Sequence, residues 1–175
     1  MNFLHLIKER YSVRKYLAKK VEENKLNHIL EAGRVAPTAL NKQPQRFLVL
    51  SSPTALAKLN KAGNTHGAPL AIVVCGLEDQ AWVRPQDGHN MAEIDASIAT
   101  TQMMLAAWEQ GVGSCWITWF DPAVVREELN LPDNVLPVNI LALGYADGPA
   151  QSADRHETAR MPLKEMVWLE ERPSS

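Results

Sequence analysis

Three residues that could hold an anion stand at alternate positions in residues 10–16. They are Arg10, Ser12 and Arg14, directly after a short apolar helical pattern. Side chains two positions apart in an extended chain point to the same side, so these three would share one face. The other face would carry Tyr11, Val13 and Lys15. Arginine binds phosphate oxygens in pairs and stays charged, so the three residues suit a phosphate dianion. An isolated motif of this length is nevertheless more often a solvated basic turn, so the phosphate hypothesis needs support from other parts of the chain.

A second candidate binding loop spans residues 37–44. Prolines bound it at both ends, and it leads directly into the apolar run 47–50. Proline together with small polar residues between two periodic segments indicates a loop, and the apolar run after it indicates a strand.

The spacing of apolar residues predicts the elements that must position these loops. Helices are expected near residues 3–7, from residue 26 with weakening at Gly33 and an end at Pro37, from a Ser52 cap to Gly63, over residues 95–110, and from an Asp121 cap to residue 129. Strands are expected over residues 47–50, 70–75, 113–120 and 138–145, with the continuous apolar run 70–75 as a central strand covered on both faces. Residues 149–155 read as a loop. Helices come first and strands separated by helices follow, so we predict an α+β layer fold.

Bulk properties limit the class of protein. The 175 residues fit a single domain over residues 1–175, with 46% hydrophobic and 22% charged residues and a formal net charge of −2. This balance gives no bulk attraction for nucleic acid. No signal peptide and no run of about 18 apolar residues is present, so we expect a cytoplasmic protein with no membrane partner. Cys75 and Cys115 fall in apolar runs, which favours buried reduced thiols over a redox or nucleophilic role.

Several common kinds of site are disfavoured. The chain has no Walker-type loop and no G-x-S-x-G turn, and its histidines lack the spacing of a zinc site. The sequence Gly111-Val112-Gly113 leads from a helix into a strand, which is the reverse of a dinucleotide-binding turn. Hydrolase and NTPase functions therefore lose support, and we expect no bound metal.

Four motifs in register resemble the nitroreductase family of flavin enzymes. The first is R-[RYH]-S-x-[RK]-x-[FY] at residues 10–16, and the second is P-[ST]-x-x-N-x-Q-P at residues 37–44. The third joins an alanine-rich helix after Asp95 to residues 111–117, and the fourth is R-x-P-L-x-E at residues 160–165. Each motif alone is weak, but together they span nearly the whole chain.

The resemblance implies a central mixed, largely antiparallel sheet flanked by helices, in an intertwined homodimer with FMN at the subunit interface. The residues carried over by motif fall into three groups. Arg10, Ser12, Arg14 and Arg160 would hold the phosphate and ribityl chain; Pro37, Thr38, Ala39 and Asn41 would lie against the ring from the partner subunit; and Ile117, Thr118 and Trp119 would contact the ring near N5. A fixed backbone N–H near N5 would suit the charge that reduction builds there.

The implied activity is ping-pong electron transfer from NADH or NADPH to a small-molecule acceptor, such as a nitroaromatic, quinone or enone. The flavin carries the chemistry, so no catalytic side chain is named. One alternative is an FMN-binding protein of the same fold without nicotinamide turnover, serving flavin storage, sensing or flavin modification. Another is a helical scaffold protein with chance motifs.

Departures from the family pattern refine these expectations. Gln45 stands where an aromatic residue is frequent, and Thr118-Trp119 stands where Gly-Gly is common, so we expect an open or Trp-walled site for small acceptors. For the Thr118 side chain we expect a packing role in a strand, with an effect on protonation near N5 as the alternative. Thr158 occupies the place of a second cation, which would leave the phosphate to Arg10, Arg14 and Arg160. The stretch between residues 125 and 138 is too short for an inserted helical lid.

Overall fold

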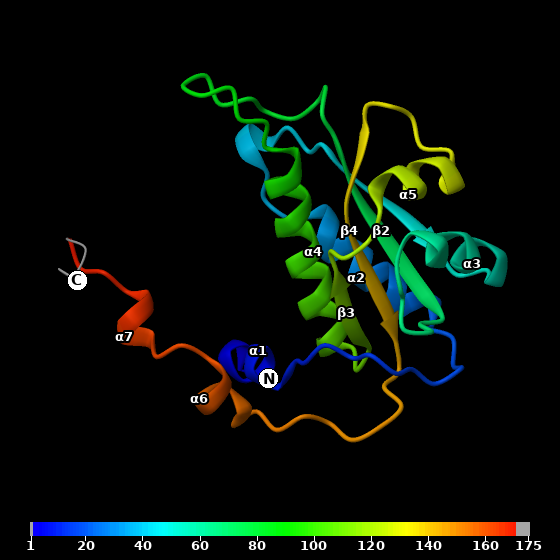
Figure 1. Ribbon diagram of the computed structural model, residues 1–175. Helices are drawn as coiled ribbons and strands as arrows, with labels where there is room; N and C mark the ends of the chain where they lie inside the picture. Colours follow the sequence, from blue (N-terminus) through cyan, green and yellow to red (C-terminus); the bar gives the residue numbers. More distant parts are fainter. Residues whose placement is uncertain (1, 171–175) are drawn as a thin grey trace.

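A four-stranded sheet forms the centre of the molecule in the computed structural model, which describes residues 2–170 (Figure 1). Its strands are β1 (Gln45–Leu50), β2 (Leu70–Leu77), β3 (Gly113–Ile117) and β4 (Val135–Gly144), in the order β1-β2-β4-β3. All neighbouring strands are antiparallel. The only parallel pairing within residues 2–170 is the isolated bridge between Ser12 and Ser114. The predicted α+β class and largely antiparallel sheet are confirmed.

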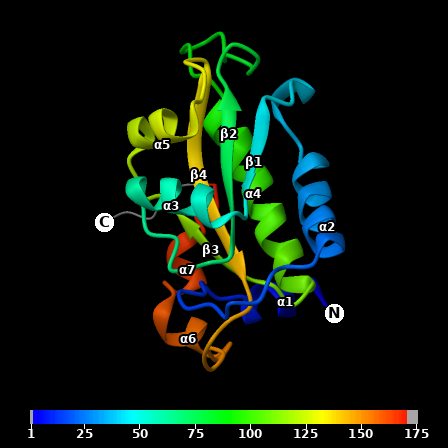
Figure 2. The ribbon, with the colours of Figure 1, turned by 90° about the vertical axis from the view of Figure 1, so that its right-hand side faces the viewer.

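Helices cover both faces of this sheet. They are α1 (Phe3–Glu9), α2 (Glu23–Arg34), α3 (Pro53–Ala62), α4 (Ala92–Glu109), α5 (Pro122–Leu129), α6 (Arg155–Ala159) and α7 (Leu163–Met166), with a short 3-10 turn η1 (Ala39–Asn41). Helices α3 and α5 lie on one face, while α2 and α4 lie on the other (Figure 2).

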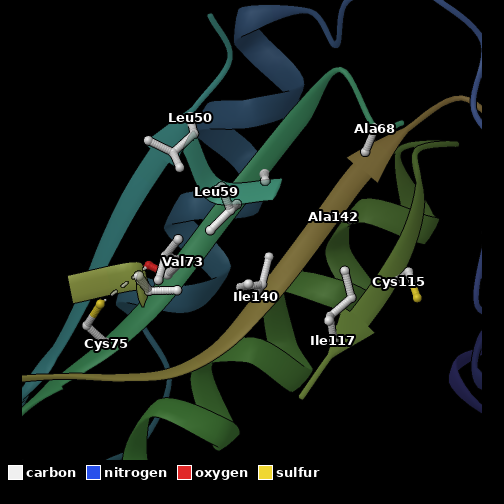
Figure 3. Packing of buried hydrophobic residues seen from close by; sticks show 11 residues of the cluster. Leu50, Leu59, Ala68, Val73, Cys75, Cys115, Ile117, Ile140 and Ala142 are labelled. Atoms are coloured by element: carbon white, nitrogen blue, oxygen red, sulfur yellow. Dashed lines mark hydrogen bonds between the residues drawn. The ribbon is translucent and has the colours of Figure 1, made fainter. Parts of the chain in front are cut away.

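Strand β2 is buried along its whole length, as the continuous apolar run predicted. Its alternate residues serve two cores. Ala71, Val73 and Cys75 pack with Leu59 and Val125 from α3 and α5 (Figure 3). Leu70, Ile72 and Val74 pack with Ile29 and Met103 from α2 and α4. A strand that fills two cores needs no polar face, which explains why its sequence does not alternate.

Helix α2 continues through Gly33, where the sequence predicted that the helix would weaken. A Cβ added to Gly33 would lie 2.8 Å from Phe47 Cζ and 2.9 Å from Met103 Sδ. The glycine therefore lets α2 approach β1 and α4 closely, and the helix ends one residue later at Arg34. The observed end thus lies between the predicted weakening at Gly33 and the predicted end at Pro37, although packing, rather than a turn, requires the glycine.

The predicted caps are confirmed, whereas the predicted end of the third strand is not. Ser52 accepts a hydrogen bond from Ala55 N–H, and Asp121 accepts from Ala123 N–H and Val124 N–H, so both residues cap helices that begin with proline. Strand β3 ends at Ile117, opposite Ile140, instead of continuing to residue 120. Thr118 is therefore not a strand residue, and the strand-packing role weighed for it was wrong.

Helices α1 and α6 lie side by side below the sheet (Figure 1), although they are far apart in the sequence. Helix α6 follows a loop over residues 149–154 and lies beside α1 (Figure 1), where His156 Nε2 is 3.0 Å from the Lys8 carbonyl. Helix α7 then leads away from the body of the molecule. Among residues 2–170, no helix combines the length and apolar character needed to cross a membrane.

Candidate functional site

Residues 10–14 lie along the exposed edge of β3. Val13 N–H donates to the Ser114 carbonyl at 2.8 Å, and Ser12 forms the bridge to Ser114. Tyr11 and Val13 are buried. The side chains of the predicted anion face are half-buried at Arg10 and Ser12 and exposed at Arg14. The predicted alternation is thus present over these five residues.

The alternation ends at Lys15, which the sequence placed on the same face as Tyr11 and Val13. Its side chain is exposed, and Nζ pairs with Asp147 Oδ2 at 2.8 Å. The backbone explains the difference: Asp147 N–H donates to the Lys15 carbonyl and Tyr16 bridges Ala146, so the chain turns to pair with the end of the sheet.

A cleft of about 380 Å³ opens between this segment and the loop after β4. One wall is Tyr11, Ser12, Val13, Arg14 and Lys15; the other is Ala146, Asp147, Gly148, Pro149 and Gln151. The two walls carry the charges of Arg14, Lys15 and Asp147, and Asp147 is already paired with Lys15. Arg14 is left as the uncompensated charge of the cleft, which suits an anionic group.

Three guanidinium groups gather next to this cleft. The pKa of Arg10 is lowered, first by burial and then by the positive charges of Arg155 and Arg160. Arg155 Nη2 also donates to the Arg10 carbonyl at 2.6 Å, which holds α6 in place. Within residues 2–170, no acidic side chain pairs with Arg10, Arg14 or Arg160. Like charges held together without a counter-ion favour binding of a dianion.

Arg155 was not among the predicted site residues. The sequence motif drew attention to Thr158 as the place of a missing second cation. The structure supplies that cation from Arg155, three residues earlier, which the short helix α6 places beside Arg10. A signal was present, since Arg155 and Arg160 both flank this helix, but only the fold shows that Arg155 reaches residue 10.

The strand end that should lie near a flavin ring is held by close packing. Ile117 is buried, while Thr118 and Trp119 are exposed past the last pair of β3. A Cβ on Gly63 would lie 2.7 Å from Phe120 Cβ and 3.1 Å from the Trp119 carbonyl oxygen. Gly63 thus lets the turn after β3 rest against the end of α3. The indole of Trp119 is 93% exposed and forms no wall within its own chain.

The loop over residues 37–44 has an unusual backbone. Leu40, Asn41 and Gln43 have φ values of 49°, 55° and 52°, in the left-handed region that non-glycine residues seldom adopt. The loop holds this shape through its own groups, since Thr38 Oγ1 accepts from Gln43 N–H at 3.1 Å and Gln43 Nε2 donates to the Asn41 carbonyl at 3.1 Å. A strained, internally bonded loop presents a fixed surface.

Asp95 anchors this loop to α4 and was not among the predicted site residues. It is 1% exposed, and its Oδ1 accepts a hydrogen bond from Ala39 N–H at 2.9 Å. Its other oxygen, Oδ2, is buried without a partner among the described residues. The first turn of α4 favours a carboxylate there through the helix dipole. The signal was an acidic residue in the otherwise apolar face of a buried helix.

The structure brings the predicted residues together as two separate groups. Asp95 holds the 37–44 loop at the start of α4, whereas Tyr11 meets Trp108 at its end, with ring centroids 5.3 Å apart. Thirteen residues of helix separate these contacts by about 20 Å, at a rise of about 1.5 Å per residue. Figures 1 and 2 both place the 37–44 loop and residues 10–14, the arginine segment, at opposite ends of α4. Residues 117–119 start about 10 Å along β3 from the bridge to Ser12, since Ile117 is three residues past Ser114.

Comparison with known proteins identifies the family. A model of the nitroreductase family matches residues 7–65 and 56–145. The chain belongs to the nitroreductase family. These matched residues include the arginine segment, the 37–44 loop, α4 and β3.

Solved structures and a curated protein agree with membership of the nitroreductase family. A nitroreductase family protein from Clostridium difficile 630 is 48% identical, with a TM-score of 0.97 over 98% of this chain and 100% of the other. A protein named FMN-dependent nitroreductase from Clostridium difficile R20291 is 28% identical, with a TM-score of 0.78 over 97% and 99%. The protein named NADH dehydrogenase from Thermus thermophilus is 30% identical over 91% of each chain.

Replacing Asp95 tests how this nitroreductase family member holds its loop. We expect Asp95→Ala to loosen residues 37–44, because Ala39 N–H loses an acceptor worth about 1–3 kcal/mol when left unpaired. Asp95→Asn keeps an acceptor oxygen and should change the loop less. The rate of tryptic cleavage after Lys42, which is exposed in this loop, measures the effect. Equal cleavage of the wild type and Asp95→Ala would show that the contact does not hold the loop.

The two cysteines of this nitroreductase family member are free and buried, as predicted. Burial raises the pKa of the Cys75 thiol to about 11, and it also raises that of Cys115 against the opposing charges of Arg14 and Arg10. Neither thiol is therefore an activated nucleophile at neutral pH.

The raised pKa of Cys75 sets an expected pH dependence of stability. The folded protein keeps the thiol proton, whereas the unfolded chain releases it near the ordinary pKa of 9.0. The thiol therefore contributes fully to the free energy of unfolding below pH 9, and this contribution is lost as the pH rises to about 11. Urea unfolding at about pH 8 and about pH 10 should show lower stability at the higher pH. In Cys75→Ala this loss should be smaller; an identical loss would assign it to other groups.

Proposed function

We propose that this chain is an FMN-dependent oxidoreductase that takes electrons from NADH or NADPH and works as a homodimer with FMN at the subunit interface. The observation that carries the proposal is the cluster of Arg10, Arg155 and Arg160, which holds three positive charges without an acidic partner among residues 2–170. The names of the relatives support the cofactor and donor, since one is an FMN-dependent nitroreductase and another an NADH dehydrogenase.

The residues present fit the phosphate end of FMN. Arg10 is half-buried at the cleft, Arg14 lines it, and Ser12 adds a hydroxyl between them. Arg160 follows α6 directly and faces the same group of charges. Burial and then the charges of Arg155 and Arg160 lower the pKa of Arg10, and a phosphate dianion would offset both effects by balancing the positive charge.

The ring end fits a site completed by a second chain. Pro37, Thr38, Ala39 and Asn41 cannot meet Arg10 within one chain, because α4 separates them. A two-fold dimer can bring the start of one α4 to the end of the other, since each chain then supplies one half of each site. The outer face of α4 carries a groove of about 350 Å³ lined by Glu93, Ile94, Ser97, Ile98 and Thr101, which is suited to such packing.

The carboxy-terminal arm also favours a dimer. Met161, Leu163, Met166 and Leu169 are between 59% and 84% exposed, although all four are apolar. A run of exposed apolar side chains is unusual on a monomer and indicates burial against another surface. We propose that this arm, with α7, lies on the partner subunit.

When bound, FMN supplies the hydride chemistry that protein side chains lack. The chain's own residues position and enclose it. Arg10, Ser12, Arg14 and Arg160 would hold the phosphate, and the partner's Thr38 and Asn41 would contact the ring. The backbone at Thr118 and Trp119, packed against Gly63, would offer N–H groups to the ring, where reduction adds charge. Donor and acceptor would use the same open side in turn, in ping-pong order.

The proposed acceptors are small electron-poor molecules such as nitroaromatics, quinones and enones. We further propose one domain over residues 1–175, of which residues 1 and 171–175 lie outside the described residues, and a cytoplasmic location where NADH and NADPH are available.

Anaerobic reduction tests the proposal directly. Purified protein should be yellow, should bleach when NADH or NADPH is added under nitrogen, and should regain its colour when a quinone or nitroaromatic follows. A yellow protein that neither donor bleaches would favour flavin binding without nicotinamide turnover. A colourless protein that takes up no FMN would favour the scaffold function.

Trp119 is the residue expected to limit acceptor size. Trp119→Gly should raise kcat/KM for a three-ring quinone relative to a one-ring quinone by roughly tenfold, the scale on which pocket shape discriminates substrates. Its exposed indole makes no core contact in its own chain, so folding should be unaffected. Trp119→Phe keeps an aromatic wall and serves as the control. An equal loss of kcat/KM for both quinones in Trp119→Gly would make Trp119 a binding or packing residue. Equal kcat/KM for the two quinones in the wild type would exclude a narrow site.

A further inference from the structure

A second basic pocket lies against the 37–44 loop, at the end of α4 away from the arginine cluster. It has a volume of about 410 Å³ and is lined by Arg34, Lys42, Gln43, Gln45, Arg46, Phe47 and Gln80. Three of these residues are cationic and none is acidic. The chain as a whole carries a net charge of −2, so a pocket lined only by positive and neutral groups is a local departure from its average.

Two of the three cations have no acidic partner. Arg34 pairs with Glu31 at 2.5 Å, so its charge is offset. Lys42 and Arg46 form no ion pair among residues 2–170. They therefore provide the net positive charge of the pocket.

Arg46 is held in a fixed orientation without being neutralised. Its Nη1 donates to the Gln43 carbonyl at 3.0 Å and to the Gln45 carbonyl at 2.8 Å, and its Nη2 donates to Gln80 Oε1 at 3.0 Å. Guanidinium has five N–H donors, so these bonds leave about two of them free. A preorganised guanidinium with unused donors is suited to an oxyanion.

Gln45 adds a buried amide to the same pocket. It is 8% exposed, and its Oε1 is buried without a hydrogen-bond partner among the described residues. Rotation of the amide by half a turn places Nε2 at this position, where it could donate to a ligand. A buried polar group without a partner costs free energy that a bound ligand can restore.

The pocket is close to the proposed ring-binding residues. Lys42 follows Ala39 by three residues, so their Cα atoms lie within about 11 Å of each other at 3.8 Å per residue. Lys42 N–H also donates to the Ala39 carbonyl at 3.1 Å, which folds the loop more tightly than this limit. A dinucleotide with its nicotinamide on the flavin ring is long enough to reach across this loop.

We propose that Lys42, Arg46 and Gln45 bind a phosphoryl group of the nicotinamide dinucleotide donor, either its pyrophosphate or the 2′-phosphate of NADPH. This inference rests on the proposed function and adds to it the residues that recognise the donor. The pocket is separate from the arginine cluster at the other end of α4, so the two anion sites take different phosphates.

Lys42→Glu tests the proposal, with Lys20→Glu as the control. Both lysines are exposed and both changes alter the net charge equally, but Lys20 does not line this pocket. For Lys42→Glu, KM for NADPH should rise about tenfold, the effect of about 1.4 kcal/mol of lost binding, while kcat stays within about twofold. Turnover of 1-benzyl-1,4-dihydronicotinamide, which has no phosphate, should not change.

Binding without chemistry gives an independent reading. Calorimetry with 2′-phospho-ADP-ribose and with ADP-ribose should show about tenfold weaker binding to Lys42→Glu than to Lys20→Glu. A loss for both compounds would assign the pocket to the pyrophosphate, and a loss for the first alone would assign it to the 2′-phosphate. Both outcomes support the proposal.

Other outcomes would overturn it. Unchanged binding and unchanged KM would exclude a phosphate contact, and an equal fall in turnover of the benzyl compound would show that Lys42 acts through loop structure. If ADP-ribose phosphates bind through Lys42 but no donor bleaches the protein, the proposed function fails while the phosphate pocket stands.

Discussion

Arg10→Ala should weaken FMN binding by roughly 10- to 100-fold without lowering the stability of the flavin-free protein. The loss corresponds to about 1.5–3 kcal/mol for a hydrogen bond from a charged group. Stability should stay the same or rise slightly, because the substitution removes a half-buried charge that lies beside Arg155 and Arg160. Fluorescence titration with FMN and thermal unfolding measure the two effects.

Two further variants show whether this effect belongs to the cluster. Arg14→Ala should also weaken FMN binding, but less, since Arg14 is exposed. Lys20→Ala is the control, because Lys20 is exposed and does not line the cleft. Unchanged FMN affinity in Arg10→Ala, or an equal loss in Lys20→Ala, would contradict the assignment of the phosphate to Arg10.

Two defective variants should restore sites when they are combined in one dimer. Arg10→Ala damages the phosphate side of a site, whereas Ala39→Pro removes the N–H that Asp95 holds and damages the ring side. In a mixed dimer, one site carries both defects and the other carries neither. Random mixing by co-expression should therefore restore wild-type FMN affinity at about a quarter of the sites, as two-fold symmetry requires.

A pair with both defects on the same side provides the control. In a mixed dimer of Arg10→Ala and Arg160→Ala, every site lacks one arginine, so no intact site forms. Recovery by the first pair but not by the second would show that two chains share each site. If the first pair also gives no recovery, the phosphate and ring sides do not come from different subunits.

The features that the sequence predicted correctly are those set by neighbouring residues. The continuous apolar run of β2 reflects burial on both faces, and the caps at Ser52 and Asp121 depend on the next three residues alone. The extended segment after α1 likewise follows from the alternation of Tyr11 and Val13 with polar residues. Local patterns of this kind do not need the tertiary fold to be recognised.

Other features depend on contacts between distant parts of the chain. Arg155 reaches Arg10 across 145 positions, and Asp95 reaches Ala39 across 56. The close packing of Gly33 could not be predicted, because its neighbours Phe47 and Met103 come from other elements. Thr118 was expected in a strand because its side chain favours strands, but the pairing of β3 with β4 ends at Ile117, opposite Ile140. Spacing in one sequence cannot supply these tertiary relations.

The exposed apolar arm around α7 has a consequence for how many complete FMN sites exist at a given protein concentration. If the arm and the outer face of α4 are covered only in a dimer, a single chain holds an arginine cluster without a ring-side loop near it. Dilution would then separate the chains and remove complete sites to the same extent. Excess FMN would restore sites only by binding to the dimer and so favouring reassociation of the chains. Activity per chain would therefore depend on the concentration of protein as well as on the supply of cofactor.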